Sequence, residues 1–226
     1  MKIKNSLEEA VDPYGEDHVG SSSDNPIRPD AFELSNQEKI ELIEEKVADI
    51  LHILGMDLTD DSLKGTPNRV AKMYVDEIFG GLHPKKKPKA STFSNSYKYG
   101  EILVEKNITL YSTCEHHLLP IVGRAHVAYI SNGTVVGLSK MNRIVEYYAK
   151  RPQVQERLTL QIVQELKSVL GTEDVACVID AKHLCVNSRG IKDISSSTIT
   201  SEFGGAFKNN ETKLEFLDYI KLDTEF

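Results

Sequence analysis

The sequence predicts an α+β fold, in which helices and an antiparallel sheet occupy separate stretches of the chain. Apolar residues recur at helical spacing before residue 82 and alternate at a period of two after residue 107. Strand pairs followed by helices, and then by further strands, indicate α+β rather than alternating βαβ units. The 226 residues, 40% of them hydrophobic, suffice for one domain with an N-terminal appendage.

Composition and charge exclude several classes of protein. The net charge of −7 argues against a dedicated nucleic-acid binder, which usually carries a surplus of basic residues. The first residues lack the apolar core of a secretory signal, and no stretch approaches the ~18 apolar residues that span a bilayer. We therefore expect a cytoplasmic protein with no membrane partner, whose three cysteines remain thiols.

Four regions follow from shifts in composition. Residues 1–34, rich in Asp, Glu, Ser, Pro and Gly, are predicted to form a flexible tail. Residues 35–82 are predicted to be helical, and residues 83–106 to be a Lys/Pro-rich linker and lead-in to the sheet. Residues 107–226 are predicted to hold the sheet and its helices.

The N-terminal region carries signals for two helices. Ser35 and Glu38 form a capping box, apolar residues then recur at helical spacing to residue 54, and Gly55 ends the helix. The second helix is predicted to begin with Thr66 as N-cap and Pro67 as its first residue. Its buried stripe is predicted to be Val70, Tyr74 and Ile78.

The sheet region alternates strand and helix patterns in the order that the fold class requires. Residues 107–113, 122–130 and 135–138 are predicted to be successive antiparallel strands. Helices are predicted over 138–150 and 154–170, the second stopped by Gly171. Strand-like sequence returns at residues 175–181, 183–186 and 197–201.

Two short segments have the spacing of metal ligands. Cys114 and His117 lie three residues apart, and alternation along a strand would direct His183 and Cys185 to one face. Cys114, His117 and Cys185 would leave one tetrahedral position open, as in catalytic zinc sites. A closed structural site, with His116 or His183 as fourth ligand, is the alternative. The surplus of imidazoles favours the open site, with His116 and His183 transferring protons as zinc-bound water attacks.

A second set of residues is typical of anion binding. Ser139, Lys140 and Arg143 crowd the first turn of a predicted helix, where free N–H groups and the helix dipole favour negative charge. A solvated helix end with two ordinary cations is the plain alternative. Further cations that could join a polyphosphate pocket are Arg189, Arg69 and Lys72. Glu156, beside Gln155, has the chemistry to accept two N–H donors from a guanine edge, or serves only as a helix-dipole partner.

Four motifs together resemble the GTP cyclohydrolase I family. They are STCEHHLLP, GLSKMNRIVEYYAKRPQVQERLT, HLCVNSRGI and GTPNRVAKMYVDEIFGGL, and the likeness runs in order from about residue 36 to 220. The resemblance implies a tunnelling fold (T-fold), in which subunits join their sheets into a ring with helices outside. It further implies a homodecamer of two stacked pentamers, with active sites between subunits and residues 107–226 as the catalytic domain.

The resemblance also assigns roles to residues. It makes Cys114, His117 and Cys185 the ligands of one Zn²⁺ per subunit, and His116 and His183 the acid/base pair. It makes Glu156, with the backbone of Gln155, the guanine anchor. The ribose and triphosphate contacts would be Ser139, Lys140, Arg143 and Arg189, while Arg69 and Lys72 would reach a neighbouring subunit's site.

The implied reaction is the hydrolysis of GTP to formate and 7,8-dihydroneopterin triphosphate, the first step of tetrahydrofolate and pterin biosynthesis, with no redox cofactor. Asn187 and Ser188 depart from the expected motif, which leaves the surroundings of Arg189 less defined. Two other functions fit less well. A related T-fold nitrile reductase uses a nicotinamide cofactor and lacks this zinc set, and a non-catalytic zinc scaffold would not need His116, His183 and Glu156.

Overall fold

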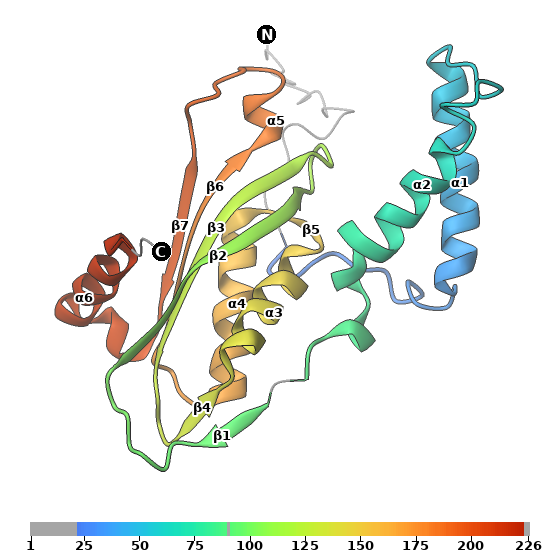
Figure 1. Cartoon of the computed structure of the whole chain (residues 1–226). Helices are drawn as coiled ribbons and strands as arrows, with labels where there is room; N and C mark the ends of the chain where they lie inside the picture. The colour runs from blue at the N-terminus through green and yellow to red at the C-terminus, as the bar shows by residue number, and fades with distance from the viewer. Residues whose placement is uncertain (1–21, 90, 224–226) are drawn as a thin grey trace, which may run out of the picture.

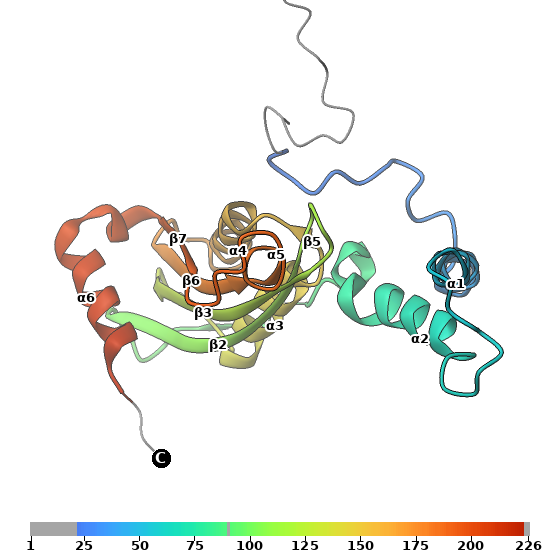
Figure 2. The ribbon, with the colours of Figure 1, turned by 90° about the horizontal axis from the view of Figure 1, so that it is seen from above.

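The computed structural model describes residues 22–89 and 91–223. A sheet with helices on its faces forms the body, and a pair of N-terminal helices projects to one side (Figures 1 and 2). Among the described residues, no helix is both long and apolar enough to cross a membrane. The separate sheet and helical regions agree with the α+β class that the sequence predicts.

The central sheet has five strands in the order β5-β2-β3-β6-β7. Three long antiparallel pairings join β2 (Ile102–Cys114), β3 (Pro120–Ile130), β6 (Val175–His183) and β7 (Thr198–Phe203). The short strand β5 (Pro152–Gln153) runs parallel to the last two residues of β2. Most of β2 therefore forms one edge of the sheet, and β7 forms the other.

Alternating side chains divide the core between the two faces of the sheet. On one face, residues such as Cys177 pack against α3 (Leu138–Ala149) and α4 (Gln155–Leu170) in the larger core. On the other face, Val178 belongs to a smaller cluster with α6 (Asn210–Lys221). Burial raises the pKa of the Cys177 thiol, as expected for a cysteine that only fills the core. The sequence analysis did not predict α6 or the 3₁₀ turn η4 (Gly205–Lys208) before it.

The sheet starts earlier than the sequence predicts. Strand β2 begins at Ile102 rather than at residue 107. A bulge between Glu105 and Ile108 interrupts the alternation of inward and outward side chains. Asn107 has a φ of 58°, and its N–H donates to His126 Nδ1 at 3.3 Å. The extra residue reverses the inside and outside positions of the strand, which hides its first half from a period-two search.

The strand that follows the SNGT turn does not extend the main sheet. β4 (Thr134–Val136) pairs with β1 (Thr92–Ser94) in a separate two-stranded sheet, so the prediction of three successive strands is wrong. Part of the predicted linker thus has regular structure, including the 3₁₀ turn η3 (Pro84–Lys86). Pairing between segments some forty residues apart leaves no local signal in the sequence.

The first N-terminal helix forms as predicted but buries little of its apolar stripe. α1 (Asn36–Ile53) has the capping box of Ser35 and Glu38, and Gly55 follows it with a φ of +83°. Ile40 is the buried residue of this helix, whereas Leu54 is 70% exposed.

The second helix differs from the prediction at both ends. α2 (Thr66–Lys72) has Gly65 rather than Thr66 as its N-cap, and it passes into a π-helical segment, η1 (Met73–Ile78). Its buried residues are Pro67 and Ala71, while the predicted stripe of Val70, Tyr74 and Ile78 is only partly buried. The wider π-helical turn shifts the side chains that follow it around the axis, which is why a regular 3.6-residue stripe fails here.

A close contact joins the N-terminal helices to the body. In η2 (Gly80–Leu82), a Cβ added to Gly81 would lie 2.0 Å from the carbonyl oxygen of Tyr147. The Gly81 N–H donates to Lys150 O at 2.9 Å, and Arg151 Nε donates to Gly81 O at 2.9 Å. Only glycine allows this approach of backbone to α3.

Part of the segment predicted to be a flexible tail, residues 22–34, contacts the rest of the protein, while residues 1–21 lie outside the described residues. Asn25 is 8% exposed, and its amide donates to Pro152 O at 2.7 Å. Lys39 Nζ donates to Ala31 O at 2.6 Å. Polar residues in this segment form hydrogen bonds with other parts of the protein instead of with water. Composition alone does not indicate such contacts.

Candidate active site

The register of the sheet brings the predicted metal ligands to one end of it. Thr113, near the end of β2, pairs with Pro120 at the start of β3, and Ile121 pairs with His183, the last residue of β6. The start of β3 therefore lies between the ends of β2 and β6. Residues that follow these two strand ends meet above β3.

A tight turn presents the first pair of ligands. Leu118 N donates to Cys114 O at 2.9 Å, and Cys114 N donates to Leu119 O at 2.8 Å. Leu118 has a φ of 52°, which lets the chain reverse within a few residues. Cys114 is buried at the base of the turn and His117 is exposed on it, so the thiol and the imidazole approach one point from different depths.

Cys185 reaches the same point by a route that the sequence analysis did not predict. Strand β6 ends at His183, and Cys185 lies in a single helical turn, α5 (Leu184–Asn187), so the prediction of a strand over 183–186 is wrong. The chain must leave the sheet here because β3 begins at Pro120 and offers no further pairing beyond Ile121. The helical turn folds the Cys185 side chain back over the sheet end.

The three predicted ligands do come together. One ligand atom from each of Cys114, His117 and Cys185 lies within 4.8 Å of the other two. A hydrogen bond with His183 is the main cause that lowers the pKa of the Cys114 thiol to about 6. Burial, and then the neighbouring Cys114, raise the pKa of Cys185, against the opposing charge of Arg189.

This donor set fits zinc. Two sulfur atoms and one imidazole nitrogen are ligands that Zn²⁺ prefers, and the lowered pKa of Cys114 favours the thiolate that binds metal. Ligand atoms around a tetrahedral zinc lie roughly 3.3–3.8 Å apart, close to the spacing of the three atoms here, which all lie within 4.8 Å of one another. Among the described residues, the group that could hold a metal ion comprises these three side chains.

His183 is held by a partner that fixes its tautomer. Its Nε2 lies 2.8 Å from Oε1 of Gln155, the first residue of α4, whose side chain is 1% exposed. The Gln155 amide nitrogen donates to the carbonyl oxygens of Thr198 and Ile179, so its oxygen must face the imidazole. The Nε2–H group of His183 therefore donates to Gln155, and Nδ1 is the ring nitrogen left for other partners.

His116 lies next to a buried ion pair. Its Nδ1 is 3.8 Å from Cys114 Sγ, and its Nε2 is 3.9 Å from Oε1 of Glu115. The Glu115 carboxylate accepts two hydrogen bonds from the Arg157 guanidinium, at 2.6 and 3.1 Å. Arg157 is 3% exposed, so this pair is shielded from solvent.

The residues expected to contact the base and the nearest phosphate flank the metal ligands. Glu156 is exposed in the first turn of α4, beside Gln155. Arg189 is exposed after α5, in a loop that Asn187 organises by donating to the carbonyl oxygens of Asp193 and Ser196. The departure from the family motif at Asn187 therefore has a structural role in this loop.

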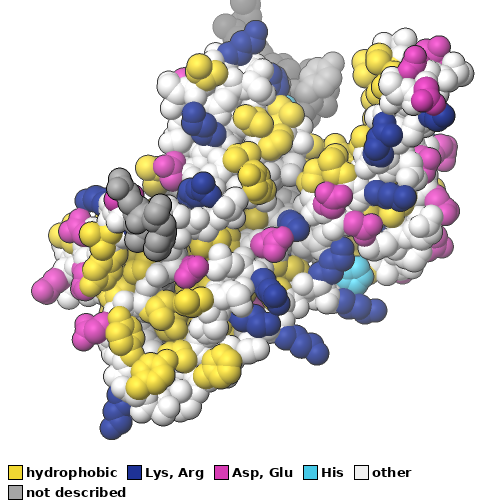
Figure 3. All heavy atoms as spheres, viewed as in Figure 1, with side chains coloured by type: hydrophobic (Ala, Val, Ile, Leu, Met, Phe, Trp, Pro, Cys, Tyr) yellow, Lys and Arg dark blue, Asp and Glu magenta, His cyan; other side chains and the backbone are white. Residues whose placement is uncertain are grey.

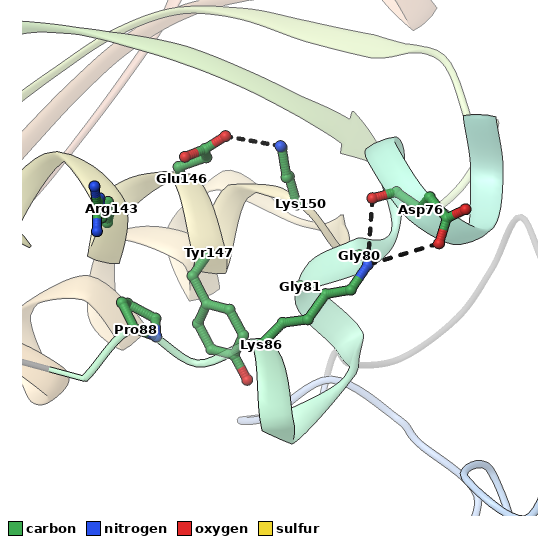
Figure 4. Close-up of a pocket in the computed structure, with 9 residues that line it drawn as sticks. All are labelled: Asp76, Gly80, Gly81, Lys86, Pro88, Arg143, Glu146, Tyr147 and Lys150. Atoms are coloured by element: carbon green, nitrogen blue, oxygen red, sulfur yellow. Dashed lines mark hydrogen bonds and ion pairs between the residues drawn. The ribbon is translucent and has the colours of Figure 1, made fainter. Parts of the chain in front are cut away.

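The remaining predicted phosphate ligands lie elsewhere. Ser139 is ten residues before Ala149 in α3, roughly 15 Å along the helix axis, and Ala149 O accepts from Ser112, two residues short of Cys114. Arg143 lines a cavity of about 320 Å³ with Lys86 and Lys150 (Figure 4). It also lines a second cavity along the β2 edge. Lysine and arginine side chains gather over this part of the surface, while apolar side chains lie over the sheet (Figure 3).

Arg69 and Lys72 are not brought to the metal ligands within this chain. Both are exposed on α2, in the part that projects from the sheet (Figure 2). Arg69 Nη2 donates to Thr66 Oγ1 at 2.8 Å and to Ser62 O at 3.2 Å. Their predicted contact with substrate would have to be made in another subunit.

Comparison with known proteins identifies the family. The family model described as GTP cyclohydrolase I matches residues 43–221. The chain belongs to the GTP cyclohydrolase I family. A protein of Flavobacterium johnsoniae named GTP cyclohydrolase 1 is 76% identical over 219 residues, covering 97% of this chain and 98% of the relative. Relatives of the same name from Citrobacter koseri and Salmonella arizonae are 48% and 49% identical over 204 residues, 90% of this chain and 92% of each relative.

Sequence reasoning missed three side chains that support this end of the sheet. They are the Gln155 amide on His183, the Arg157 guanidinium on Glu115, and Asn187 in the Arg189 loop. Each lies inside a motif that was interpreted for another residue. Pairings between positions 28 and 42 residues apart have no signature in a single sequence, although the buried charge of Arg157 required a carboxylate somewhere.

Proposed function

We propose that this chain is a zinc-dependent GTP cyclohydrolase I that hydrolyses GTP to formate and 7,8-dihydroneopterin triphosphate. The observation that carries the proposal is the convergence of Cys114, His117 and Cys185 beside two histidines in a chain of this family. Membership of the family supports the substrate and the reaction, and the geometry supports the roles of the residues.

Cys114, His117 and Cys185 would hold the Zn²⁺ ion, one per subunit. When bound there, the ion would supply Lewis acidity and lower the pKa of water at its open position. The protein's contribution is to keep the two thiols and the imidazole at one point. The turn at Leu118 and the helical turn α5 do this from opposite sides of the start of β3.

His183 and His116 are proposed as the acid/base pair. Because Gln155 holds the Nε2 proton of His183, the nitrogen that accepts and returns protons is Nδ1. His116 is exposed on the same turn as the ligands, next to Cys114 Sγ, where it can reach the ribose or purine. Two imidazoles with separate environments allow one to act as acid while the other acts as base.

Substrate binding is assigned to residues at both edges of the sheet. The exposed Glu156 carboxylate would accept the two N–H groups of the guanine edge, with the Gln155 backbone beside it. Arg189 would contact phosphate from the loop after α5. Ser139, Lys140 and Arg143 would bind ribose and triphosphate through the first turns of α3, where N–H groups and cations combine.

The separation of these groups favours an assembly in which neighbours share each site. The first turn of α3 is roughly 20 Å from Cys114 along the sheet and faces the β2 edge, whereas Gln155 bonds to β7 at the opposite edge. Most of the β2 edge has open backbone groups that a β7 edge of another subunit could pair. We propose the T-fold ring and the decamer on this basis, with Arg69 and Lys72 reaching a further subunit.

Turnover of GTP by the purified protein tests the proposal. Neopterin fluorescence after oxidation should appear, disappear when a chelator removes zinc, and return when zinc is restored. His183→Ala should lower kcat by about 10²–10⁴-fold, as expected for loss of a general acid/base. His52→Ala, an exposed histidine on α1, is the matched control and should retain full activity. Absence of pterin from the folded, zinc-loaded protein would refute the proposal.

A further inference from the structure

The N-terminal segment 22–25, here called the strap, is bonded to the layer beneath the candidate site. Asn25 lies at the centre of this contact: its amide donates to Pro152 O, and its Oδ1 accepts from Arg151 at 3.1 Å and from Gln161 at 3.2 Å. Asp24 accepts from the same Gln161 amide at 2.6 Å. The strap lies outside the residues 43–221 that the family model matches.

One route leads from the strap to Glu115 through Arg157. Arg157 Nε donates to the carbonyl oxygen of Ser22 at 2.9 Å, while its two terminal nitrogens donate to the Glu115 carboxylate. Three bonds in one plane fix the guanidinium completely, because its N–H groups have a rigid fork geometry. The Ser22 carbonyl therefore accepts the third hydrogen bond of Arg157, whose ion pair with Glu115 lies next to His116.

A second route leads to the same turn through β5. Asn25 bonds the carbonyl of Pro152, and the next residue, Gln153, accepts from the backbone N–H of Glu115 at 3.0 Å. Gln153 is 0% exposed, and its amide donates to Gln161, which the strap also contacts. The side chain and the backbone of Glu115 are thus both held by groups that the strap fixes.

We propose that the strap and Arg157 are positioning elements that set the place of His116 for the reaction. Glu115 stands between a metal ligand, Cys114, and His116, so a shift of Glu115 moves the imidazole relative to the metal. Displacements of about 1 Å in such groups can cost ~10²-fold in rate. This inference rests on the proposed function for its kinetic test and on the geometry for its structural test.

Variants of Arg157 and Asn25 test the kinetic consequence. Arg157→Met should lower kcat about 10–100-fold, the range typical of partners that orient metal-site residues, with little change in the KM for GTP. Arg157→Lys should recover part of the loss, because a lysine keeps one charged bond to Glu115. Asn25→Ala should lower kcat in the same direction, and Asn25→Asp, which keeps an acceptor for Arg151 and Gln161, should lower it less.

Arg28→Ala is the matched control within the same N-terminal segment. Arg28 is exposed and pairs only with Asp30 among the described contacts, so kcat should stay at the wild-type value. Zinc content and melting temperature are measured for every variant, and kcat is expressed per folded, zinc-loaded subunit. This normalisation separates misplacement of His116 from loss of metal or of the fold.

Hydrogen exchange gives a readout that does not depend on turnover. Amides of residues 113–118 should exchange faster in metal-free Arg157→Met and Asn25→Ala than in metal-free wild type or Arg28→Ala, because the turn has lost an anchor. Unchanged exchange, or a normalised kcat equal to that of the wild type, would overturn the proposal. Wild-type protein without GTP turnover would refute the proposed function instead, while the exchange measurement would still decide the role of the strap.

Discussion

Two regions of the sheet, the end where the candidate metal ligands meet and the β2 edge beside α3, differ in the functional groups that they carry. At the end where β2 and β6 finish, one chain brings together the three candidate metal ligands, His183 and the amide that bonds to it. At the β2 edge, Arg143 of α3 lines two open cavities, and the three candidate metal ligands are not among the residues that line them. This difference is what we expect if the metal group is built within the subunit and phosphate binding needs a neighbouring subunit.

A mixture of two inactive variants tests most directly whether neighbouring subunits share a site. His183→Ala removes a group at the metal end of the sheet, and Arg143→Ala removes one at the β2 edge. Each substitution alone should lower kcat/KM by at least ~10²-fold. If neighbours share sites, subunits unfolded and reassembled together at equal amounts should regain about a quarter of the wild-type sites, since each ring interface is used head to tail.

A second measurement compares this mixture with controls. Two variants of the metal end, His183→Ala and Cys185→Ala, should show no recovery of activity on mixing, because each intact site needs both groups from one chain. No recovery in the first mixture would show that each subunit carries a complete site by itself. Recovery in the control would show that His183 and Cys185 of one site come from different chains.

Thiol reactivity tests which cysteines belong to the candidate metal group. Zinc-loaded protein should resist alkylation at Cys114 and Cys185. Chelation should make both more reactive, because the lowered pKa of Cys114 increases its thiolate fraction and Cys185 is partly exposed. Cys177 should stay unmodified in both states, because it is fully buried and its pKa is raised. Peptide mass spectrometry assigns the sites, with urea-denatured protein as the fully labelled reference. Equal labelling of Cys114 before and after chelation would argue against its role as a ligand.

The smallest expected effect concerns the bulge between the two ends of β2. Burial lowers the pKa of His126, so its contribution to stability is present above the unfolded value of 6.5 and is lost as pH falls below it. Protonation would also remove the Nδ1 acceptor for Asn107 N–H. We expect His126→Asn to flatten the decrease in Tm between pH 7.5 and 5.5 by about 2–4 °C, which corresponds to ~1 kcal/mol. An identical pH dependence in His126→Asn and wild type would contradict this assignment, and His52→Asn serves as control.

Helices α1 and α4 and the grouping of the candidate metal ligands could be predicted from the sequence because their signals are local. A capping box at Ser35, a glycine stop at Gly171 and the spacing of Cys114 and His117 each lie within a few residues. The convergence with Cys185 was also predicted, although the helical turn that achieves it was not.

The features that sequence reasoning missed depend on distant partners. The β1 and β4 pairing, the start of β2 before the bulge at Asn107 and the anchoring of Asn25 all require contacts between segments far apart in the chain. Polar residues such as Asn25 look like tail residues until their buried partners are known. The assignment of Arg143 to a neighbour's site likewise stays a prediction that a single chain does not test.

The candidate metal ligands come from two segments far apart in the chain, so they are synthesised at different times. Cys114 and Cys185 are seventy-one positions apart, so a growing chain exposes the first pair of ligands long before the third exists. At ~5–20 residues per second, the interval is about 4–14 s. During that time Cys114 also lacks His183, whose hydrogen bond is the main cause of its lowered pKa in the folded protein. Assembly of the three candidate ligands into one group is therefore a late event of biosynthesis.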